Sequence, residues 1–452
     1  MEAIISFLEQ VSEFVWGPYM LIFLVGTGVY LTLGLRGQTV RKIGYAFKLL
    51  MRGRKKEQQE GEGDITPFQA LMTSMSATIG TGNIAGVATA IFLGGPGAVF
   101  WMWITALFGM ATKFGESILA VKYRETMPDG SFAGGPMYYI KNGMGDKWKW
   151  LGFLFALFAA VAAFGIGNTV QSNSVARAVE RAFEIPYWVT GVVLAGLTFA
   201  VVIGGIKRIA NVTEKIVPFM AIIYVLGALL IIFSNVSQLG AALQTIFQDA
   251  FTGTAASGGF AGATIIAVMR FGVARGVFSN EAGLGSAPMA HAAAQTKDPV
   301  KQGIIGMLGT FLDTICVCSL TALVIIMTGA WTSGQTGAEL STMAFSQGLP
   351  GPGGAIVGFG LIFFAFSTIL AWCYYGQVAV EYIFGLKAVT PYRYVYVILV
   401  LVGAVIELDI VWTFSDIMNG LMIVPNLIAL LALSPVIFRT TKEYFQSLPH
   451  KR

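Results

Sequence analysis

The sequence predicts an all-α polytopic membrane protein with about 11 transmembrane helices. Of its 452 residues, 55% are hydrophobic and only 12% are charged. Soluble chains carry about 25% charged residues, so this composition lacks the polar surface needed to cover so much apolar mass. Apolar runs recur along the chain, and basic residues gather between them. The chain is therefore expected to lie in a lipid bilayer, with no separate soluble domain.

The apolar runs define the predicted spans, since a membrane-spanning helix needs roughly 20 mostly apolar residues. Their number is odd, so the termini are expected on opposite sides of the membrane. The spans cover residues 17–35, 69–92, 96–122, 150–182, 186–205, 213–234, 258–288, 300–329, 353–384, 390–407 and 411–437.

The distribution of lysine and arginine orients these spans. The linker from Arg36 to Lys56 contains eight of the 29 basic residues, and basic loops remain on the cytoplasmic side. By contrast, lysine and arginine are absent from four segments at the other ends of the spans, 1–16, 235–257, 330–352 and 408–410. We expect a multi-pass protein of the cell membrane with its N-terminus outside and its C-terminus in the cytoplasm.

The sequence argues against an enzyme and against a metal centre built from cysteine and histidine. The three cysteines and two histidines show no familiar metal-ligand spacing. Polar residues are spread over several spans rather than clustered for hydrolysis. Basic residues lie between spans instead of on one domain, so their expected partner is the anionic membrane surface and not nucleic acid.

The second span contains a segment that is too polar for its depth. The run SMSATIGTGNIAG, residues 74–86, surrounds Gly80 and Gly82 with Ser76, Thr78, Thr81 and Asn83. Close helix packing through small residues is one interpretation. The other is an unwound hinge, whose free carbonyls bind a cation and whose free amides bind an anionic group.

The seventh span contains a second such segment, RFGVARGVFSNEAGLGSA at residues 270–287. Arg270, Arg275 and Glu281 are tolerable at membrane depth only when paired or facing water. An ion pair that latches the inner mouth and a contact with substrate are both open interpretations.

The two breaks occupy corresponding positions in two halves of opposite orientation. Without the first span, ten remain; one break opens the first five and the other opens the second five. Paired broken helices of this kind indicate a secondary transporter with a 5+5 inverted repeat and a site at the midplane. We therefore divide the chain into an N-terminal helix and basic linker (1–66), a first repeat (67–235), a second repeat (236–438) and a cytoplasmic tail (439–452).

Two further polar groups are candidates for the same site. Ser367 and Thr368 are adjacent in an aromatic surround, with Trp372 one turn beyond. Their hydroxyls either bond back to the preceding turn or complete an all-oxygen cation site. In the fourth span, Asn168 and Gln171 share a helix face that can line a cavity.

Residues 94–109, GGPGAVFWMWITALFG, resemble the signature of the alanine/glycine:cation symporter family. The GTGN break before this motif and the SNEAGLGSAP run after the second break resemble the same family, so the likeness covers the whole chain. That family is in turn similar to transporters with the leucine-transporter fold, which shares the inverted repeat. The resemblance implies sodium-coupled uptake of alanine or glycine.

The resemblance also implies a set of cation ligands. One Na+ is expected between the carbonyls of Ser76 and Ile79 and the side chains of Ser367 and Thr368. A second site in related transporters uses a first-helix asparagine, which corresponds to Asn83, together with the substrate carboxylate.

A small zwitterion needs amide donors for its carboxylate and oxygen acceptors for its ammonium group. We expect the amides around Gly80, Thr81 and Gly82 to bind the carboxylate. For the ammonium we expect carbonyls in the stretch Gly272, Ala274 and Gly276, with Thr78 and Gln171 as helpers. Trp372 is expected to shape the pocket and keep it small.

The nearest alternative is a proton-coupled amino-acid transporter of the same fold, in which Asp313, Glu116 or Asp416 would be essential. Asp313 and Asp416 are candidates for binding a cation or a proton, or for pairing with a buried arginine. A channel would repeat one pore motif, whereas the two breaks differ in sequence. A monomer is compatible with the sequence, which does not define the oligomeric state.

Overall fold

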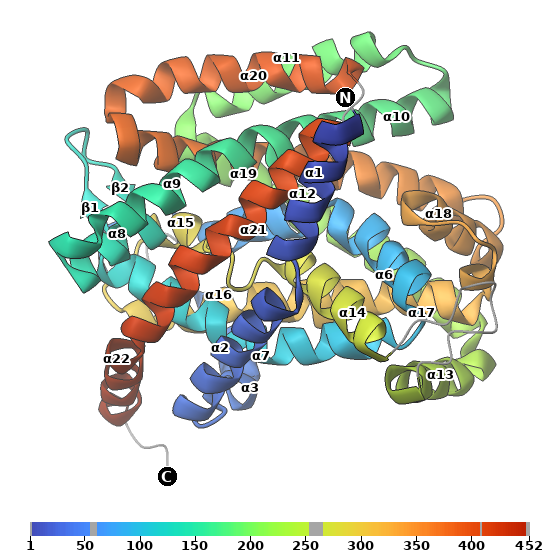
Figure 1. The fold of residues 1–452 in the computed structure, drawn as a ribbon, viewed down its shortest axis with the longest axis horizontal. Helices are drawn as coiled ribbons and strands as arrows, with labels where there is room; N and C mark the ends of the chain where they lie inside the picture. The colour runs from blue at the N-terminus through green and yellow to red at the C-terminus, as the bar shows by residue number, and fades with distance from the viewer. Residues whose placement is uncertain (1, 55–60, 253–264, 407–408, 449–452) are drawn as a thin grey trace.

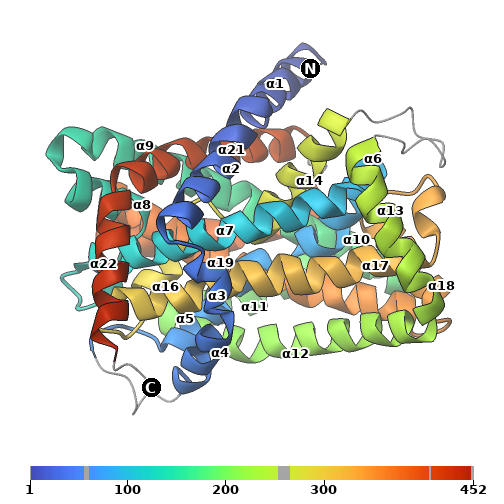
Figure 2. The same ribbon diagram turned by 90° about the horizontal axis from the view of Figure 1, so that it is seen from below.

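Helices occupy the positions of the predicted spans in the computed structural model, which describes residues 2–54, 61–252, 265–406 and 409–448. The long helices pack side by side in one bundle (Figures 1 and 2). A two-stranded antiparallel hairpin, β1 (Glu125–Thr126) with β2 (Phe132–Ala133), is the one sheet in the described residues.

The first half of the chain forms α1 (Glu2–Val15), α2 (Pro18–Gly34), α3 (Gln38–Arg41), α4 (Ile43–Arg52), α5 (Pro67–Thr78), the π-helical η2 (Gly82–Gly86), α6 (Val87–Gly94), α7 (Ala98–Lys122), α8 (Pro136–Tyr139), η3 (Ile140–Met144), η4 (Asp146–Trp148), α9 (Lys149–Phe164), the π-helical η5 (Gly165–Thr169), α10 (Val170–Phe183), α11 (Tyr187–Val202) and α12 (Gly205–Ser234).

The second half forms η6 (Val236–Gln238), α13 (Leu239–Thr252), α14 (Ile265–Asn280), α15 (Ala287–Ala292), α16 (Pro299–Thr310), the π-helical η8 (Phe311–Cys318), α17 (Ser319–Met327), η9 (Ala330–Thr332), α18 (Gly337–Gly348), α19 (Gly353–Phe384), η10 (Leu386–Ala388), α20 (Val389–Val405), α21 (Asp409–Ala432) and α22 (Ser434–Ser447).

Helix length and composition identify part of the predicted set of spans. In the described residues, 8 helical segments are long and apolar enough to cross a membrane, and the bent pair formed by α5 and η2–α6 raises the number to 9. The predicted spans 186–205 and 258–288 correspond to α11, which has only 16 residues, and to α14. Residues 258–264 lie outside the described part. The predicted positions therefore agree with the helices, while a total of about 11 is not established by helix length.

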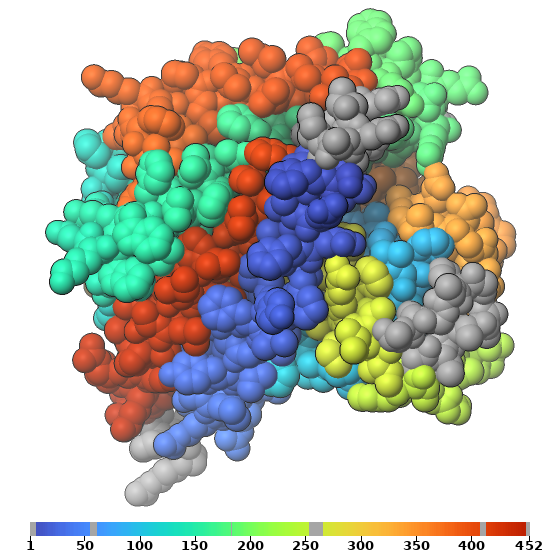
Figure 3. All heavy atoms as spheres, in the orientation of Figure 1, coloured from blue at the N-terminus to red at the C-terminus, as the bar shows by residue number. Residues whose placement is uncertain are grey.

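Two helices form the centre of the bundle. Helix α7 packs against α2, α14, α15 and α16, and α19 packs against α5, α9, α10, α12 and α18. Helix α1 lies along α21, as the space-filling view also shows (Figure 3). Large apolar side chains are exposed along α11, α12 and α20, among them Leu197, Leu226 and Ile398. These outer faces suit contact with lipid tails, since a bilayer, unlike water, favours exposed apolar residues.

The first predicted break is confirmed. Helix α5 begins with a capping box, in which the Thr66 hydroxyl accepts from Gln69 N and the Gln69 side chain accepts from Thr66 N. It ends at Thr78, and the chain becomes helical again at Gly82 with a bend of 51°.

The second break is shorter than predicted. Helix α14 continues unbroken to Asn280, and the interruption covers residues 281–286. A Cβ on Gly272 would lie 2.4 Å from the Ala98 carbonyl oxygen, and one on Gly276 would lie 3.3 Å from the Met102 Cα. These two glycines therefore let α14 approach α7 closely, as small residues commonly do between membrane helices. The sequence analysis assigned these glycines to an unwound segment, whereas in the structure they serve helix packing.

This packing predicts opposite effects for two Gly→Ala substitutions. Gly272→Ala should destabilise the protein by about 1–3 kcal/mol, because the added methyl group meets backbone atoms of α7. Gly196→Ala, on the exposed side of α11 with nothing within 4 Å of an added Cβ, should stabilise it by about 0.4–1 kcal/mol. The apparent melting temperatures of the two purified variants in detergent test this, and a stable Gly272→Ala protein would contradict the close approach.

Candidate functional site

A small cavity of about 20 Å³ lies where the two interrupted helices meet. Its walls come from α5 and η2 at the first break, the end of α14 at the second, and η5–α10, α19 and α21 around them. The lining residues are Ala77, Thr78, Gly80, Thr81, Gly82, Ile166, Gln171, Phe278, Glu281, Thr368, Trp372 and Asn419. Six of the predicted substrate residues are in this set: Thr78, Gly80, Thr81, Gly82, Gln171 and Trp372.

The geometry of the first break explains its glycines. The Asn83 side chain accepts from Gly80 N at 2.9 Å, which satisfies one amide of the interruption. A Cβ on Gly80 would lie 2.8 Å from the Thr368 hydroxyl, and a Cβ on Gly82 would lie 3.2 Å from the Ser279 Cα. The two glycines thus allow the unwound backbone to touch α19 on one side and α14 on the other.

Ser367 and Thr368 meet the carbonyl that the family resemblance assigns to them. The Thr368 hydroxyl lies 3.0 Å from the Ser76 carbonyl oxygen, and the Ser367 hydroxyl lies 3.4 Å from it. Each hydroxyl also lies 2.9 Å from the Phe364 carbonyl of its own helix. Both hydroxyls therefore bond back to the preceding turn of α19 and also reach the last turn of α5, whose C-cap is Ile79.

Gln171 and Trp372 form the opposite wall. Gln171 donates to the Ile166 carbonyl at 3.0 Å, while its buried Oε1 has no hydrogen-bond partner among the residues that the structure describes. Trp372 is 1% exposed, and its side chain lies against Gly167, where any Cβ would overlap it. Asn168 instead donates to the Tyr396 carbonyl. The π-helical turn η5 shifts the helical register, so the predicted polar stripe is reduced to Gln171.

The second break is fastened by buried charges on α7. Lys113 Nζ donates to the Glu281 carbonyl at 3.2 Å, and Glu116 Oε1 accepts from Gly283 N at 3.1 Å. Asn426 of α21 donates to Glu116 at 2.6 Å and to the Gly283 carbonyl at 2.8 Å. Glu281 adopts a left-handed φ of 54°, which turns the chain out of α14 at this point.

Glu281, the first residue after α14, lines the cavity. Ser286 donates to its Oε2 at 2.5 Å. In the described part of the chain, neither Arg270 nor Arg275 forms an ion pair with Glu281. Arg275 instead lines a second cavity together with Asp416, between α1, α14 and α21.

Asp313 connects both broken helices. Its carboxylate accepts from Asn83 at 2.7 Å, from Ser279 at 2.9 Å and from Thr314 at 2.7 Å. The side chain is completely buried in η8. Asn83 thus turns its amide N–H toward Asp313, and the oxygen atoms gathered at this point are those of the Asp313 carboxylate and of the Ser279 and Thr314 hydroxyls.

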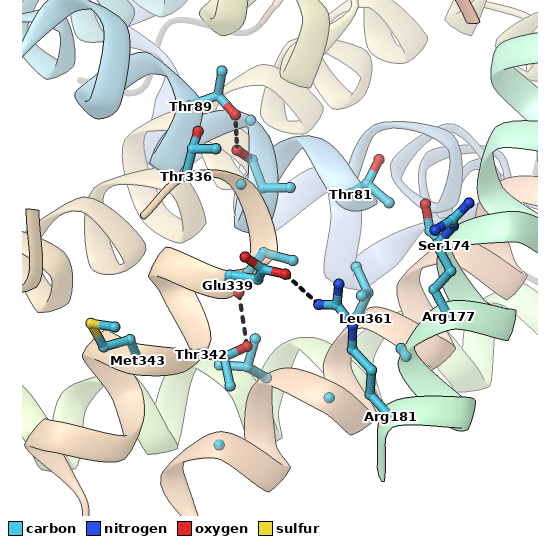
Figure 4. A pocket seen from close by; sticks show the side chains of 18 of the residues that line it. Thr81, Thr89, Ser174, Arg177, Arg181, Thr336, Glu339, Thr342, Met343 and Leu361 are labelled. Carbon is cyan, nitrogen blue, oxygen red and sulfur yellow. Dashed lines mark hydrogen bonds and ion pairs between the residues drawn. The ribbon is translucent and has the colours of Figure 1, made fainter. Parts of the chain in front are cut away.

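A vestibule of about 900 Å³ opens above the cavity, between η2, α10, α14, α18 and α19 (Figure 4). Thr81 and Phe278 line both spaces, so they separate one from the other. Arg181 of α10 pairs with Glu339 of α18 at 2.6 Å in its wall. Arg177 and Arg275 also line it, which makes the vestibule mainly basic.

Three predicted substrate residues lie elsewhere. Gly272 and Gly276 face α7 within a continuous helix. Ala274 lines the second cavity, between α1, α14 and α21, together with Arg275 and Asp416. Their carbonyls are therefore not the free backbone acceptors that the sequence analysis expected. Sequence reasoning also missed Ile166, Phe278 and Asn419 as cavity residues. Only the folded arrangement brings them to the cavity, because each comes from a different helix.

Comparison with known proteins supplies the family. The model of the sodium:alanine symporter family matches residues 1–452. The chain is 50% identical over 446 residues to the sodium/alanine symporter AgcS of Methanococcus maripaludis, with 97% of each chain covered. It is 37% identical over 441 residues to the amino-acid carrier protein AlsT of Bacillus subtilis, covering 97% of this chain and 92% of that one.

Among solved structures, a manganese transporter of Eremococcus coleocola has a similar fold. The TM-score is 0.52 at 12% identity, with 85% of this chain and 89% of that chain covered. At this identity the likeness concerns the fold alone. The match over the whole sequence decides the identity: the chain belongs to the sodium:alanine symporter family.

Proposed function

We propose that this protein imports a small neutral amino acid, alanine or glycine, together with Na+ by alternating access. Family membership makes Na+ the coupling ion. The observation that carries the proposal is the meeting of two interrupted helices around one small, polar cavity below a vestibule. Such a pair of half-helix ends is suited to a substrate with one anionic and one cationic group.

The proposed architecture is the 5+5 inverted repeat, with repeats at 67–235 and 236–438. With the N-terminus outside and the C-terminus in the cytoplasm, the vestibule faces outward. The absence of lysine and arginine from 330–352, which includes α18 at the vestibule wall, supports this orientation. Rocking of the broken helices against the remaining bundle would then open the opposite side.

The substrate carboxylate is proposed to bind at the N-terminus of the half-helix η2–α6. This helix covers Gly82–Gly94 and begins at the cavity, so its first amides and its positive dipole end point into the site. The cavity is small compared with the vestibule, and Trp372 closes one wall. Both features favour a substrate with a small side chain.

The ammonium group is proposed to bind Glu281, in place of the carbonyls first expected near Gly272. Glu281 is the only carboxylate among the residues that line the cavity. Gln171 and Asn419 line the same cavity, and their side-chain oxygens, which have no hydrogen-bond partner among the described residues, can accept additional N–H groups. These three acceptors come from three helices, so an ammonium among them would draw those helices together.

Two cation sites are proposed. The first consists of the Ser76 and Ile79 carbonyls with the Ser367 and Thr368 hydroxyls. The second consists of the Asp313 carboxylate with the Ser279 and Thr314 hydroxyls, beside the Asn83 amide. Around the breaks, Lys113 is one buried cation beside three buried carboxylates, Glu116, Glu281 and Asp313. This excess of negative charge favours the entry of cations, because an uncompensated buried charge is costly.

The test of the function is uptake of labelled alanine into proteoliposomes. An inward Na+ gradient should drive accumulation, and replacing Na+ by K+ at constant pH and voltage should abolish it. Uptake that persists without Na+ and follows a proton gradient would instead support the proton-coupled alternative, in which Glu116, Asp313 or Asp416 carries H+. Glu116 Oε2 is buried and has no hydrogen-bond partner in the described part of the chain, which is the feature that keeps this alternative open.

A ligand substitution tests the first cation site. Thr368→Val should raise the Na+ concentration for half-maximal uptake about tenfold, because one oxygen ligand is lost while the shape is retained. Thr198→Val is the matched control and should leave Na+ dependence unchanged, because this buried threonine of α11 has no hydrogen-bond partner for its hydroxyl within the described ranges.

Asp313→Asn extends this test to the second site. If two Na+ bind, either variant should lower the Hill coefficient for Na+ toward 1 while the protein still binds alanine at high Na+. An unchanged Na+ response in Thr368→Val would remove Ser367 and Thr368 from the site.

The role of Glu281 is tested with a pair of ligands. Glu281→Gln should weaken alanine binding about tenfold to a hundredfold, because a charged hydrogen bond to the ammonium is lost. Lactate carries a hydroxyl in place of the ammonium group and should therefore compete only weakly with labelled alanine for the unmodified protein. The affinity for lactate should be the same in the Glu281→Gln variant. Equal losses for both ligands, or no loss for alanine, would contradict the assignment.

A further inference from the structure

A second large cavity is formed by segments from the two ends of the chain. It lies between the end of α2, helix α3 and the C-terminal helix α22. Its volume is about 680 Å³. None of its residues lines the substrate cavity or the vestibule. It is lined by Gly34, Leu35, Arg36, Gln38, Phe438, Arg439, Thr441, Lys442, Phe445 and Gln446. We call it the basic cleft.

The basic cleft is held open by contacts at both ends. At one end, the Tyr30 and Ser434 hydroxyls lie 3.1 Å apart, and the Tyr30 and Phe438 rings are 5.8 Å apart. At the other end, the hydroxyls of Tyr45 in α4 and Tyr444 in α22 lie 2.8 Å apart. Helix α22 is thereby fixed to α2 and to α4, with the cleft between these two attachments.

The lining is positively charged. Arg36, Arg439 and Lys442 line the cleft, and no acidic residue does. Lys42 adds a fourth cation at 5.4 Å from the centre of the Phe445 ring. Arg439 lies 4.0 Å from Glu443, a distant and exposed pair, while in the described part of the chain Arg36 and Lys442 form no ion pair.

The basic cleft lies at the ends of membrane-spanning segments, where lipid headgroups are expected. One membrane-spanning segment, Ser6–Gly34, ends at the cleft, and another, Thr413–Ala432, ends just before α22. In Figure 2, α22 crosses the ends of the long helices instead of running along them. Its buried residues, including Ile437, Thr441 and Tyr444, alternate with exposed charged ones. An amphipathic helix in this position lies in the plane of the membrane surface.

We propose that the basic cleft binds the phosphate group of an anionic phospholipid. The arginines can donate paired N–H groups to phosphate oxygens, and basic pockets between membrane helices are suited to such headgroups. Leu35, Phe438 and Phe445 add apolar walls beside the charges, which suit the glycerol and the start of the acyl chains. A free phosphate ion would make no use of these walls, so the lipid is the favoured occupant.

The experiment counts lipids bound to the purified full-length protein by native mass spectrometry. Phosphatidylglycerol should bind more tightly than phosphatidylcholine, and more weakly as salt is raised. The triple variant Arg36→Gln, Arg439→Gln and Lys442→Gln should weaken phosphatidylglycerol binding by roughly a hundredfold, from the usual contribution of each basic residue near an anionic surface.

The matched control removes the same charge elsewhere. Lys122→Gln, Lys147→Gln and Lys387→Gln change three exposed lysines outside the cleft, and this variant should bind phosphatidylglycerol like the unmodified protein. Equal losses in the two triple variants would overturn the proposal in favour of a general charge effect. Displacement of the lipid by millimolar inorganic phosphate would also overturn it, by making the free ion the ligand.

Retained binding of alanine by the cleft variant would show that it is folded and that lost lipid binding comes from the cleft. If the variant fails to fold, Lys442→Gln alone, at an exposed position without an ion pair, provides the measurement. It should weaken binding about fivefold, and unchanged binding in that variant would count against the cleft.

Discussion

The structure depends on satisfying unwound backbone inside a membrane, where water is not available to hydrogen-bond free amides and carbonyls. Helix α7 meets much of this requirement through Lys113 and Glu116, which hold Glu281 and Gly283 of the second break. The Asn83 side chain accepts a hydrogen bond from the Gly80 amide at the first break and donates one to the Asp313 carboxylate. The polar cluster is therefore the condition under which two helices can be interrupted at all.

This arrangement couples the two breaks to each other. Asp313 accepts from Asn83 on η2 and from Ser279 near the end of α14, so both interrupted helices share one carboxylate. A cation that enters this cluster must change the contacts of both helices together. Under the proposed mechanism, Na+ stabilises one arrangement of the pair and raises the affinity for substrate in that arrangement, which is a shift of population between states.

The sequence predicts the first break closely because its signal is chemical. Polar residues and glycines at membrane depth have few explanations, and the helix does end between Ser76 and Gly82. The second break was predicted too long, because glycine appears both where a helix unwinds and where two helices touch. Gly272 belongs to the second kind, and only the distance to the Ala98 carbonyl reveals it.

The cavity lining was predicted in part for a related reason. Thr78, Thr81 and Trp372 lie in segments whose polarity or aromatic content stands out in the sequence. Phe278 and Asn419 lie in ordinary surroundings and become cavity residues only through the packing of α14 and α21. Gln171 was chosen by helical spacing, yet its partner Asn168 turned to Tyr396 because η5 inserts a π-helical turn that no spacing rule anticipates.

The charges along the proposed path also determine how a zwitterion would approach. The vestibule contains Arg177, Arg181 and Arg275 against Glu339, whereas Glu281 lies in the cavity below. A substrate moving inward would keep its carboxylate toward the arginines and lead with its ammonium. Thr81 lines both spaces at the start of the η2–α6 half-helix, so the carboxylate would reach the positive helix end as the ammonium reaches Glu281. Under the proposed function, the same change from positive to negative charge would draw Na+ onward to Asp313 once it has passed the basic vestibule, so one electrostatic arrangement would serve both solutes.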